Sequence, residues 1–336
     1  MSHNRKHLGH NLSILAPDQI IDRLVWYASL APSSHNTQPW LFKIKDKTIS
    51  LFANKTRWLK SSDKLERQLF ISLGTAFENL TTAAKSFGLS FIESPFAEQT
   101  ELNLIKSISI SEIKIKNIDE ETLNALISRH NNRSNFKQSS LPNKFTDFIK
   151  SLSTTNITIT LITTQELKKQ IQTIVEDATE KAFKDKYFTN ELSKWIKPSL
   201  KKYYDGMPGY NIGTPWLISL LIPHAIRYLP LAKMQTSMVK EMLTHAPAYM
   251  LISSTHNEPK SWFEIGRLFE KIWLEAEKFN IKIGVLAAPI EIDGYERKIQ
   301  QALEITNHPQ IFFRIGFSDQ IPVPSPRLNL KEIIIS

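Results

Sequence analysis

The sequence predicts an α+β fold made of two related halves. Helical and strand patterns are mixed along the chain without a regular strand–helix alternation, which is typical of this class. Two long amphipathic segments resemble each other, which indicates an internal duplication. No GxGxxG motif follows a predicted strand and no GxxxxGK[ST] motif is present, so neither a Rossmann site nor a P-loop is predicted.

The composition fits a globular protein that would depend on a cofactor for redox chemistry. The 336 residues are 41% hydrophobic and 22% charged, which is enough apolar material for a large core. There are no cysteines, so disulfides, thiolate metal sites and cysteine nucleophiles are excluded. The net charge of +9 attracts anionic partners, but the lysines are scattered. We interpret the excess as a solvated surface and expect no nucleic-acid partner.

No signal peptide is visible at the start of the sequence. The first twelve residues are polar, and we interpret 1–12 as a flexible tail rather than a metal site formed by His3, His7 and His10. The most apolar stretch, 216–232, contains charged and proline residues and is a poor membrane span. We therefore expect a cytoplasmic protein without a membrane partner.

In the first part of the chain the spacing of apolar residues predicts three helices and four strands. A helix over 17–30 should end near Pro32, and a polar loop follows over 31–40. Strands at 41–44 and 48–53 are joined by a turn at Asp46 and Lys47. A long helix over 63–88 closes at Gly88, and strands at 91–92 and 104–115 precede a helix over 118–128.

The second part of the chain has similar elements around a long irregular segment. After a short helix, we expect a strand at 158–163 and a helix over 165–182. Residues 183–234 are rich in Pro, Gly, Tyr and Trp and are too long for a simple loop, so we interpret them as a lid or an insertion. Strands at 248–253, 282–288 and 310–317, a helix over 262–279 and a terminal edge strand complete the chain.

The two long predicted helices align at an offset of 192 (266 − 74). Five identities fall between residues 72 and 90 at this offset: Gly74/Gly266, Phe77/Phe269, Glu78/Glu270, Ala84/Ala276 and Phe87/Phe279. Two amphipathic core helices can look alike without common descent, but we favour duplication. Duplication indicates a single-chain version of a symmetric dimer in which these two helices pack together.

Two polar segments are the candidates for a functional site. The loop APSSHNTQPW holds Ser33, Ser34, Asn36 and Gln38 between prolines, where they could bind the polar edge of a ring, although an ordinary loop is an equal alternative. In RHNNRSNF, Arg129 and Arg133 are four residues apart and on a helical turn would share one face around a phosphate. A solvated basic helix end is the simpler alternative. A Ser33–His35 or Ser34–His35 dyad is not favoured, because sequence neighbours seldom face each other.

These segments resemble the flavoproteins of the nitroreductase family. APSSHNTQPW is similar to that family's flavin-contacting loop, RHNNRSNF to its basic FMN-binding segment, and PIEIDGYE to its PIEG-type segment beside the flavin ring. PSPRLNL is similar to its near-terminal basic segment. The loop precedes the basic segment by about a hundred residues, the reverse of ordinary nitroreductases and similar to the internally duplicated Acg-like branch.

The resemblance implies a nitroreductase-like fold in which two halves form a pseudo-dimer with FMN between them. It implies halves at 13–127 and 128–336, with a lid at about 184–234. The residues implied to bind FMN are Ser33, Ser34, Asn36 and Gln38 from the loop, Arg129, Asn131 and Arg133 from the basic segment, Pro289, Ile290 and Glu291 beside the ring, and Arg314 and Arg327 as further positive charge. No catalytic residue or metal site is assigned.

Departures from the family pattern limit the number of flavins. Ile292 stands where a glycine usually follows the PIE triplet, which puts a backbone donor there in doubt. The second half has no copy of the serine loop and the first half has no clear basic segment, so we expect one FMN per chain.

The implied function is an FMN-dependent oxidoreductase. NAD(P)H would reduce the flavin, which passes electrons to a small acceptor such as a nitroaromatic or quinone. The alternatives are an FMN-sequestering protein with little turnover and a BluB-like enzyme that consumes its flavin. We expect a small-molecule substrate and a monomer acting as a pseudo-dimer.

Overall fold

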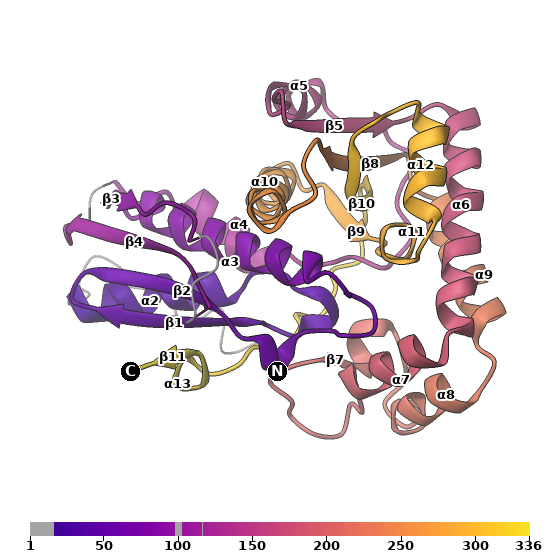
Figure 1. The fold of residues 1–336 in the computed structure, drawn as a ribbon, viewed down its shortest axis with the longest axis horizontal. Coiled ribbons are helices and arrows are strands. Elements are labelled where there is room, and N and C mark those ends of the chain that lie inside the picture. The colour runs from indigo at the N-terminus through magenta and orange to yellow at the C-terminus, as the bar shows by residue number, and fades with distance from the viewer. Residues whose placement is uncertain (1–16, 98–102, 116) are drawn as a thin grey trace.

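The computed structural model describes residues 17–97, 103–115 and 117–336 (Figure 1). The tail predicted at 1–12, with its three histidines, lies outside the described residues. In these ranges the strands form a five-stranded, a four-stranded and a small two-stranded sheet with helices around them, and the predicted α+β class is confirmed. No helix in the described ranges has both the length and the apolar character needed to cross a bilayer.

The first sheet is formed mainly by the N-terminal part of the chain. Its strands are β1 (Trp40–Lys45), β2 (Thr48–Ala53), β4 (Leu104–Glu112) and β3 (Ser90–Glu93), and each pairs antiparallel with the next. On β2, alternate residues are buried because successive side chains point to opposite faces. The buried face packs on α2 (Pro17–Ser29) and α3 (Arg67–Ser86) in one apolar core.

The second sheet repeats this arrangement. Its strands β5 (Ile157–Ile162), β8 (Ala248–Ser254), β10 (His308–Gly316) and β9 (Lys282–Val285) are again all antiparallel, in the same topological order as β1, β2, β4 and β3. A short helix precedes each sheet: α2 precedes the first and α5 (Asn143–Ser151) the second. The expectation of two related halves is therefore confirmed, whereas the boundary at 127/128 stays a prediction.

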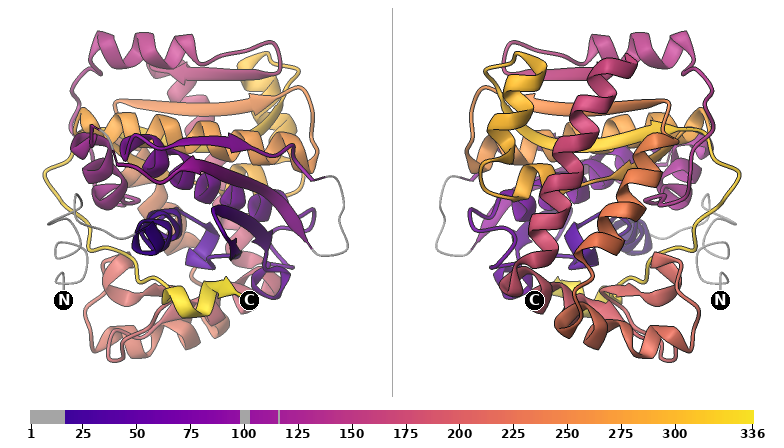
Figure 2. Two further views of the ribbon diagram at one scale, coloured as in Figure 1. Left: turned by 90° about the vertical axis from the view of Figure 1, so that its left-hand side faces the viewer. Right: turned by 90° about the vertical axis from the view of Figure 1, so that its right-hand side faces the viewer.

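Strand β8 is buried on both faces because different helices cover the two sides of its sheet. Tyr249 and Leu251 pack toward α6 (Gln165–Lys184) and α9 (Ala232–Thr244). Met250 and Ile252 pack toward α10 (Pro259–Lys278) on the other side. Figure 2 shows α6 and α9 crossing one face of this sheet. The second half therefore has three layers.

Helices α3 and α10 pack against each other between the two sheets. Their bounds, 67–86 and 259–278, differ by the same 192 positions as the predicted repeat, and so do the bounds of β3 and β9. Glycines stand where the two backbones are closest: a Cβ on Gly74 would lie 2.0 Å from the carbonyl oxygen of Phe263. The predicted packing of the repeated helices is confirmed.

The halves differ mainly in what connects their strands. A two-residue turn joins β1 to β2, whereas α6, α7 (Lys186–Trp195), α8 (Ile222–Tyr228) and α9 lie between β5 and β8. Likewise α11 (Ala288–Glu291) and α12 (Tyr295–Leu303) lie between β9 and β10. The predicted insertion is present, but it is more helical than its irregular sequence pattern indicated. Its smaller elements are β6 (Ile196–Lys197), β7 (Met207–Pro208) and the 3-10 turns η4 (Gly209–Ile212) and η5 (Ile218–Leu220).

The C-terminal segment returns to the first half of the molecule. After β10 it reaches α13 (Leu330–Ile333) and β11 (Ile334–Ile335), and β11 pairs parallel with β1 at the edge of the first sheet. The predicted terminal edge strand is thus present. This return also brings Arg327 beside the polar loop that contains the 3-10 turn η2 (Ser34–Asn36).

Several predicted boundaries were wrong. The helix expected from 63 begins at Arg67, because the Asp63 carboxylate accepts hydrogen bonds from the backbone N–H groups of Gln68 and Leu69 ahead of the first turn. The helical turn considered for Arg129 and Arg133 is also wrong. Helix α4 (Glu120–Ser128) ends before them, and Asn131 forms a β-bridge with Ile283.

Candidate functional site

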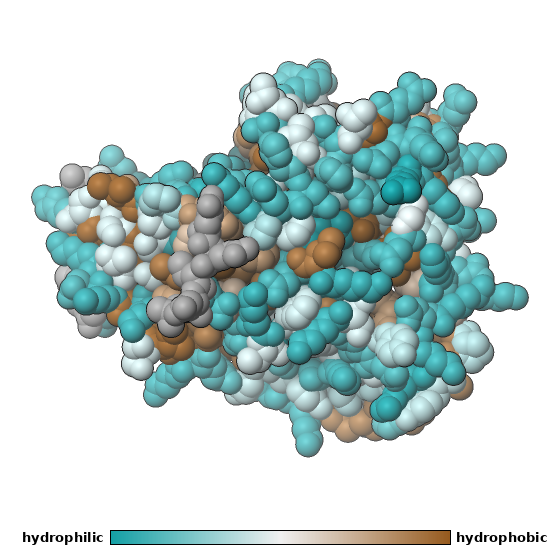
Figure 3. All heavy atoms as spheres, in the orientation of Figure 1, coloured by the Kyte–Doolittle hydropathy of each residue, from teal (hydrophilic) through white to brown (hydrophobic). Residues whose placement is uncertain are grey.

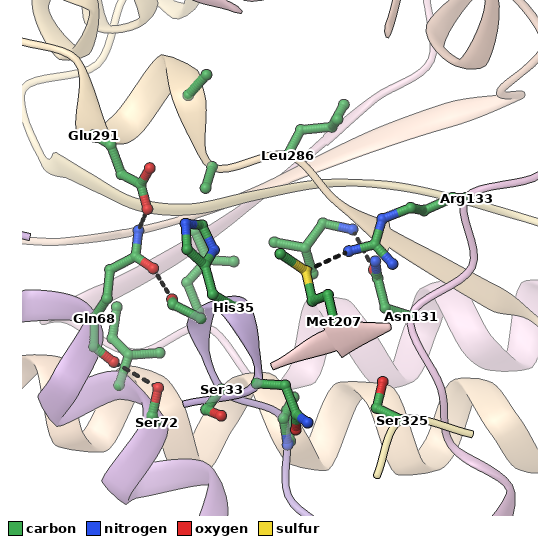
Figure 4. Close-up of a pocket in the computed structure, with 18 of the residues that line it drawn as sticks. Ser33, His35, Gln68, Ser72, Asn131, Arg133, Met207, Leu286, Glu291 and Ser325 are labelled. Carbon is green, nitrogen blue, oxygen red and sulfur yellow. Dashed lines mark hydrogen bonds between the residues drawn. The ribbon is translucent and has the colours of Figure 1, made fainter. Parts of the chain in front are cut away.

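A cavity of about 370 Å³ lies where the two halves, the insertion and the C-terminal segment meet. The first half contributes the loop 32–36 and the start of α3, and the second half contributes residues 129–133 and 285–291. Side chains of α6, and of α7 and β7 in the insertion, cover it. Figure 4 shows labelled side chains from the loop, α3, the basic segment, the 285–291 segment, β7 and the C-terminal segment around one space. The volume is within the range of small-molecule sites.

The polar loop has a strained backbone that is held by its own side chains. His35, Asn36 and Gln38 have positive φ angles of 52°, 55° and 52°, a region that residues other than glycine adopt rarely. The backbone N–H of Gln38 donates to Ser33 Oγ at 2.9 Å. This conformation turns Ser33, Ser34 and His35 toward the cavity.

Asn36 and Gln38 join the loop to two other segments. Asn36 Nδ2 donates to the carbonyl oxygens of Gly206 in the insertion, at 2.9 Å, and of Pro326, at 3.0 Å. Gln38 Nε2 donates to the Tyr204 carbonyl oxygen at 2.8 Å. Asn36 still lines the cavity, but Gln38 is buried behind it and does not. The Gln38 side chain therefore fixes the loop.

The two arginines of the basic segment differ in their surroundings. Arg129 is buried: its Nε lies 2.8 Å from Glu270 Oε1, and the guanidinium lies over the Trp273 ring at 4.6 Å. Arg133 is exposed and reaches toward the insertion, where it donates to the Asn211 carbonyl oxygen at 3.2 Å. Both line the cavity, but only Arg133 has a guanidinium that is not in a salt bridge among the described residues.

Asn131 lies between the two arginines and is held by β9. Its Oδ1 accepts a hydrogen bond from the Val285 backbone N–H at 2.9 Å, next to the bridge with Ile283. This contact orients the amide at the wall of the cavity (Figure 4).

The other two arginines implied to bind FMN, Arg314 and Arg327, differ in whether they line the cavity. Arg314 is buried and donates to the carbonyl oxygens of Ser134 and Asn132 at 2.7 and 2.8 Å, and it does not line the cavity. Arg327 does line it, and it donates to Asn36 Oδ1 at 3.0 Å and to the Leu30 carbonyl oxygen at 2.8 Å.

The segment from Ala287 to Glu291 forms one wall of the cavity. Ile290 and Glu291 line it, whereas Pro289 is buried and does not. The backbone N–H of Ile292 donates to the Ala288 carbonyl oxygen at 3.0 Å. This N–H group is therefore already hydrogen-bonded at the end of α11. The sequence had raised doubt about whether a backbone donor is available at Ile292, and this contact agrees with that doubt.

A series of hydrogen-bonded side chains crosses this wall. It was not predicted from the sequence. Ser34 Oγ donates to Gln68 Oε1, and Gln68 Nε2 donates to Glu291 Oε1 (Figure 4). Arg67 donates to the Ile290 carbonyl oxygen at 3.0 Å. Burial raises the pKa of Glu291 to about 7, and the nearby Arg67 opposes this rise. The only sequence signal for these contacts was the polar start of α3. Its partner, the segment with Ile290 and Glu291, lies far away in the sequence.

His35 was considered only as half of a weak dyad, but it has a distinct position. Burial lowers its pKa to about 4, so the ring is neutral near neutral pH. Its Nε2 is buried and has no hydrogen-bond partner among the described residues. The ring lies edge-on to Phe188 of the insertion, with centroids 6.5 Å apart.

Polar contacts fasten the insertion to the first half beside the cavity. The Glu191 carboxylate on α7 accepts hydrogen bonds from the backbone N–H groups of Ser61 and Ser62 at 3.0 and 2.9 Å. Arg57 pairs with Asp205 at 2.5 Å. We call these two contacts the latch.

Comparison with known proteins gives the chain's relatives. No family model matches it. The chain is 20% identical over 335 residues to PigM of Serratia sp., a protein named as an NAD(P)H nitroreductase, and the match covers 94% of this chain and 93% of that one. It is 33% identical over 69 residues to the Mycobacterium tuberculosis protein named NAD(P)H nitroreductase Acg, a match covering 20% and 21% of the two chains.

Among solved structures, the chain is similar to NfnB of sphigopyxis sp., described as an FMN and NADPH-dependent nitroreductase. That likeness has a TM-score of 0.42 and 14% identity, and it covers 64% of this chain and 98% of that one. Iodotyrosine deiodinase bound to FMN gives a TM-score of 0.40 at 13% identity and covers 62% and 95%. The nearly full-length match to PigM is the informative one: the chain is a relative of the proteins named NAD(P)H nitroreductase, and Acg is among those relatives.

Proposed function

We propose that this protein is an FMN-dependent oxidoreductase that passes electrons from NAD(P)H to a small acceptor such as a nitroaromatic or a quinone. One observation carries the proposal: nine of the twelve residues implied to bind FMN line a single cavity between the two halves. The three that do not are Gln38, Pro289 and Arg314. The relationship to an NAD(P)H nitroreductase along 94% of the chain supports the same reading.

The residues present fit the chemistry of FMN. A flavin offers a flat apolar ring with a polar edge and a charged phosphate. Apolar side chains of Ile71, Leu286 and Ile290 line the cavity together with the polar groups of Ser33 and Asn131. The His35 Nε2 atom is a buried polar atom without a hydrogen-bond partner among the residues that the structure describes. Such an atom is costly to leave unpaired, which supports a polar ligand in the cavity.

Arg133 is the residue we assign to the phosphate. Its guanidinium borders the cavity and is not in a salt bridge among the described residues, so it is available to form charge-assisted hydrogen bonds with a phosphate. Arg129 instead orients the wall of the site through Glu270.

The bound flavin would supply the redox chemistry by accepting a hydride and passing on electrons. The protein would position it and exclude water. Phe183, Phe188 and Leu192 of the insertion cover the cavity with apolar surface. We propose one FMN per chain, because the polar loop, the basic segment and the insertion each occur once. We also propose that the chain acts as a monomer in the cytoplasm on a small-molecule substrate, without a nucleic-acid partner.

The latch favours a second candidate function, sequestration of FMN with little turnover. An insertion fastened by Glu191 and Arg57 would slow the exchange of substrates. A BluB-like consumption of the flavin is a further alternative. It predicts loss of flavin absorbance under reductant and air.

The test is an absorbance spectrum of the purified chain, with FMN quantified after denaturation and NAD(P)H oxidation followed with and without a quinone or nitroaromatic. The proposal expects one FMN per chain and acceptor-dependent NAD(P)H oxidation. One FMN without oxidation identifies the sequestering protein and contradicts turnover. Two FMN per chain, or none after soaking with FMN, overturns the proposed site.

A further inference from the structure

The outer edge of the insertion exposes an unusual set of apolar side chains. Trp216 is 58% exposed, Leu221 68% and Tyr228 68%. We define the apolar patch as the exposed side chains on η5, α8 and their flanking residues, Trp216, Leu217, Ile218, Leu220, Leu221, Tyr228 and Leu229. Figure 3 shows apolar surface along the lower edge, in the region where Figure 1 draws α7 and α8.

The patch is separate from the core of the insertion. The inward face of α8 holds Ile222 and Ile226, one turn apart, which pack with Leu192 and Ile196 in a small apolar cluster. Within η5, Ser219 is fully buried, and its hydroxyl accepts a hydrogen bond from the Ser199 backbone N–H at 2.8 Å. The outward side chains are therefore not needed to hold these elements, and large exposed apolar patches of this kind usually mark a binding surface.

The chain segment that carries the patch has basic side chains but no acidic ones. No Asp or Glu occurs between residues 206 and 240. Arg227 is exposed on α8 itself, next to Tyr228. Lys201 and Lys202 are also exposed, and they follow Ser199, which the hydrogen bond to Ser219 holds against η5. Cations thus border the apolar side chains on two sides.

We propose that this patch docks the protein on an anionic lipid surface. Apolar side chains beside exposed cations are the combination that binds the interface of a membrane without crossing it. Trp216 and Tyr228 are residue types that favour the headgroup region. The expectation of no membrane partner rested on a segment that is too polar to span a bilayer, and this proposal replaces it, because docking requires only that one face enters the interface.

Charge favours a lipid surface over a second copy of this chain. A two-fold dimer through the patch would bring each copy's Arg227, Lys201 and Lys202 toward the same cations of the other, without acids on the patch to pair them. Anionic headgroups supply the opposite charge, and each lysine or arginine near such a surface contributes about 1 kcal/mol, or about fivefold in partitioning.

The experiment measures co-sedimentation of the full chain with vesicles of phosphatidylcholine alone and of phosphatidylcholine mixed with phosphatidylglycerol. We expect binding to the mixed vesicles only, weakened by salt. The variants are Trp216→Ser with Leu221→Ser, and separately Arg227→Ala. The matched control is Ile92→Ser, which removes a 72% exposed apolar side chain from β3, far from the patch in sequence. Circular dichroism verifies that each variant folds.

The double variant should lose binding at least tenfold and Arg227→Ala about fivefold, while Ile92→Ser binds like the wild type. Equal binding of all variants, or equal binding to both kinds of vesicle, overturns the proposal. So does a concentration-dependent dimer that the double variant abolishes while no vesicle binding occurs, because the partner is then a second copy. None of these outcomes depends on FMN content, so the proposed function is tested separately.

Discussion

Gly74 and Gly266 make the same contact in opposite directions. A Cβ on Gly74 would lie 2.0 Å from the Phe263 carbonyl oxygen, and a Cβ on Gly266 would lie 2.0 Å from the Ile71 carbonyl oxygen. Phe263 and Ile71 are separated by the same 192 positions as the two glycines. The contact is therefore symmetric about a pseudo-two-fold axis, and both backbones approach as closely as glycine permits.

Replacing either glycine with alanine should destabilise the protein. In an ordinary helix interior, Gly→Ala stabilises by about 0.5–1 kcal/mol. Here Gly74→Ala or Gly266→Ala must push two backbones apart, and we expect a loss of about 1–3 kcal/mol in the free energy of unfolding, measured in denaturant. Thr82→Ala on the same helix is the control and should change stability little. A stabilised Gly74→Ala variant would contradict the close approach.

Arg129 and Arg133 should respond differently to the same substitution. Arg133→Ala should weaken FMN retention while the fold remains intact. Arg129→Ala leaves Glu270 buried without its cation, and removing one partner of such a pair costs about 3–5 kcal/mol. Flavin content and unfolding midpoint are measured on both variants. Unchanged flavin in Arg133→Ala would show that the phosphate lies elsewhere.

His35 should make the protein sensitive to acid. Its folded pKa is about 4, below the unfolded value of about 6.5, so the unfolded state binds the extra proton between these pH values. Stability is then fully present above about pH 6.5 and falls as the pH decreases, by about 2–3 kcal/mol near pH 4. His35→Asn keeps a residue that tolerates positive φ and removes the titration. Between about pH 6.5 and pH 4 the free energy of unfolding should fall by about 2–3 kcal/mol more in the wild type than in His35→Asn, and a difference that does not change with pH would be the contrary result.

Glu291 should give the proposed reaction a pH dependence near neutrality. With a pKa of about 7, its carboxyl is protonated and able to donate a proton at the cavity wall below that pH, and it becomes an anion above it. We expect NAD(P)H oxidation to fall as the pH rises through about 7. Glu291→Gln cannot titrate, so its pH profile should be flat at a rate reduced about tenfold or more. An unchanged profile in that variant would assign the titration to another group.

The latch should control how fast the cofactor leaves. Glu191→Ala removes the acceptor for the Ser61 and Ser62 backbone N–H groups, and the insertion then opens more often. We expect faster transfer of FMN to an apo-flavoprotein trap, by about fivefold for each hydrogen bond lost. Lys194→Ala, an exposed residue on the same helix, should leave the rate unchanged. Equal rates in both variants would show that the insertion does not gate release.

The repeat of α3 and α10 could be predicted because each helix contains the matching residues within its own sequence. Gly74 and Gly266 set the register, and the structure has the same offset in the bounds of both helices. Most strands were also predictable, since alternation and apolar runs are local patterns. The start of α3 was wrong by four residues because the buried Asp63 side chain satisfies the backbone groups from outside the helix.

Much of the site could not be predicted because it depends on contacts between distant segments. Gln68 joins Ser34 to Glu291, residues that belong to different halves. Arg314 has the charge expected of a phosphate ligand, yet backbone carbonyl oxygens of 132 and 134 take up its guanidinium. The helices of the insertion were missed because α7 and α8 have only 10 and 7 residues, and because they are joined by a connection that contains proline and glycine, as at Pro208 and Gly209.

Fusion of the two halves changes what a single substitution does. In a dimer of identical subunits every substitution appears twice, so a change that improves one side of an interface is also imposed on the other. Here β1 and β2 keep a two-residue connection while β5 and β8 carry four helices. The chain can therefore alter one copy while the other preserves the shared helix pair, and such freedom lets a symmetric ancestor become a protein with one specialised face.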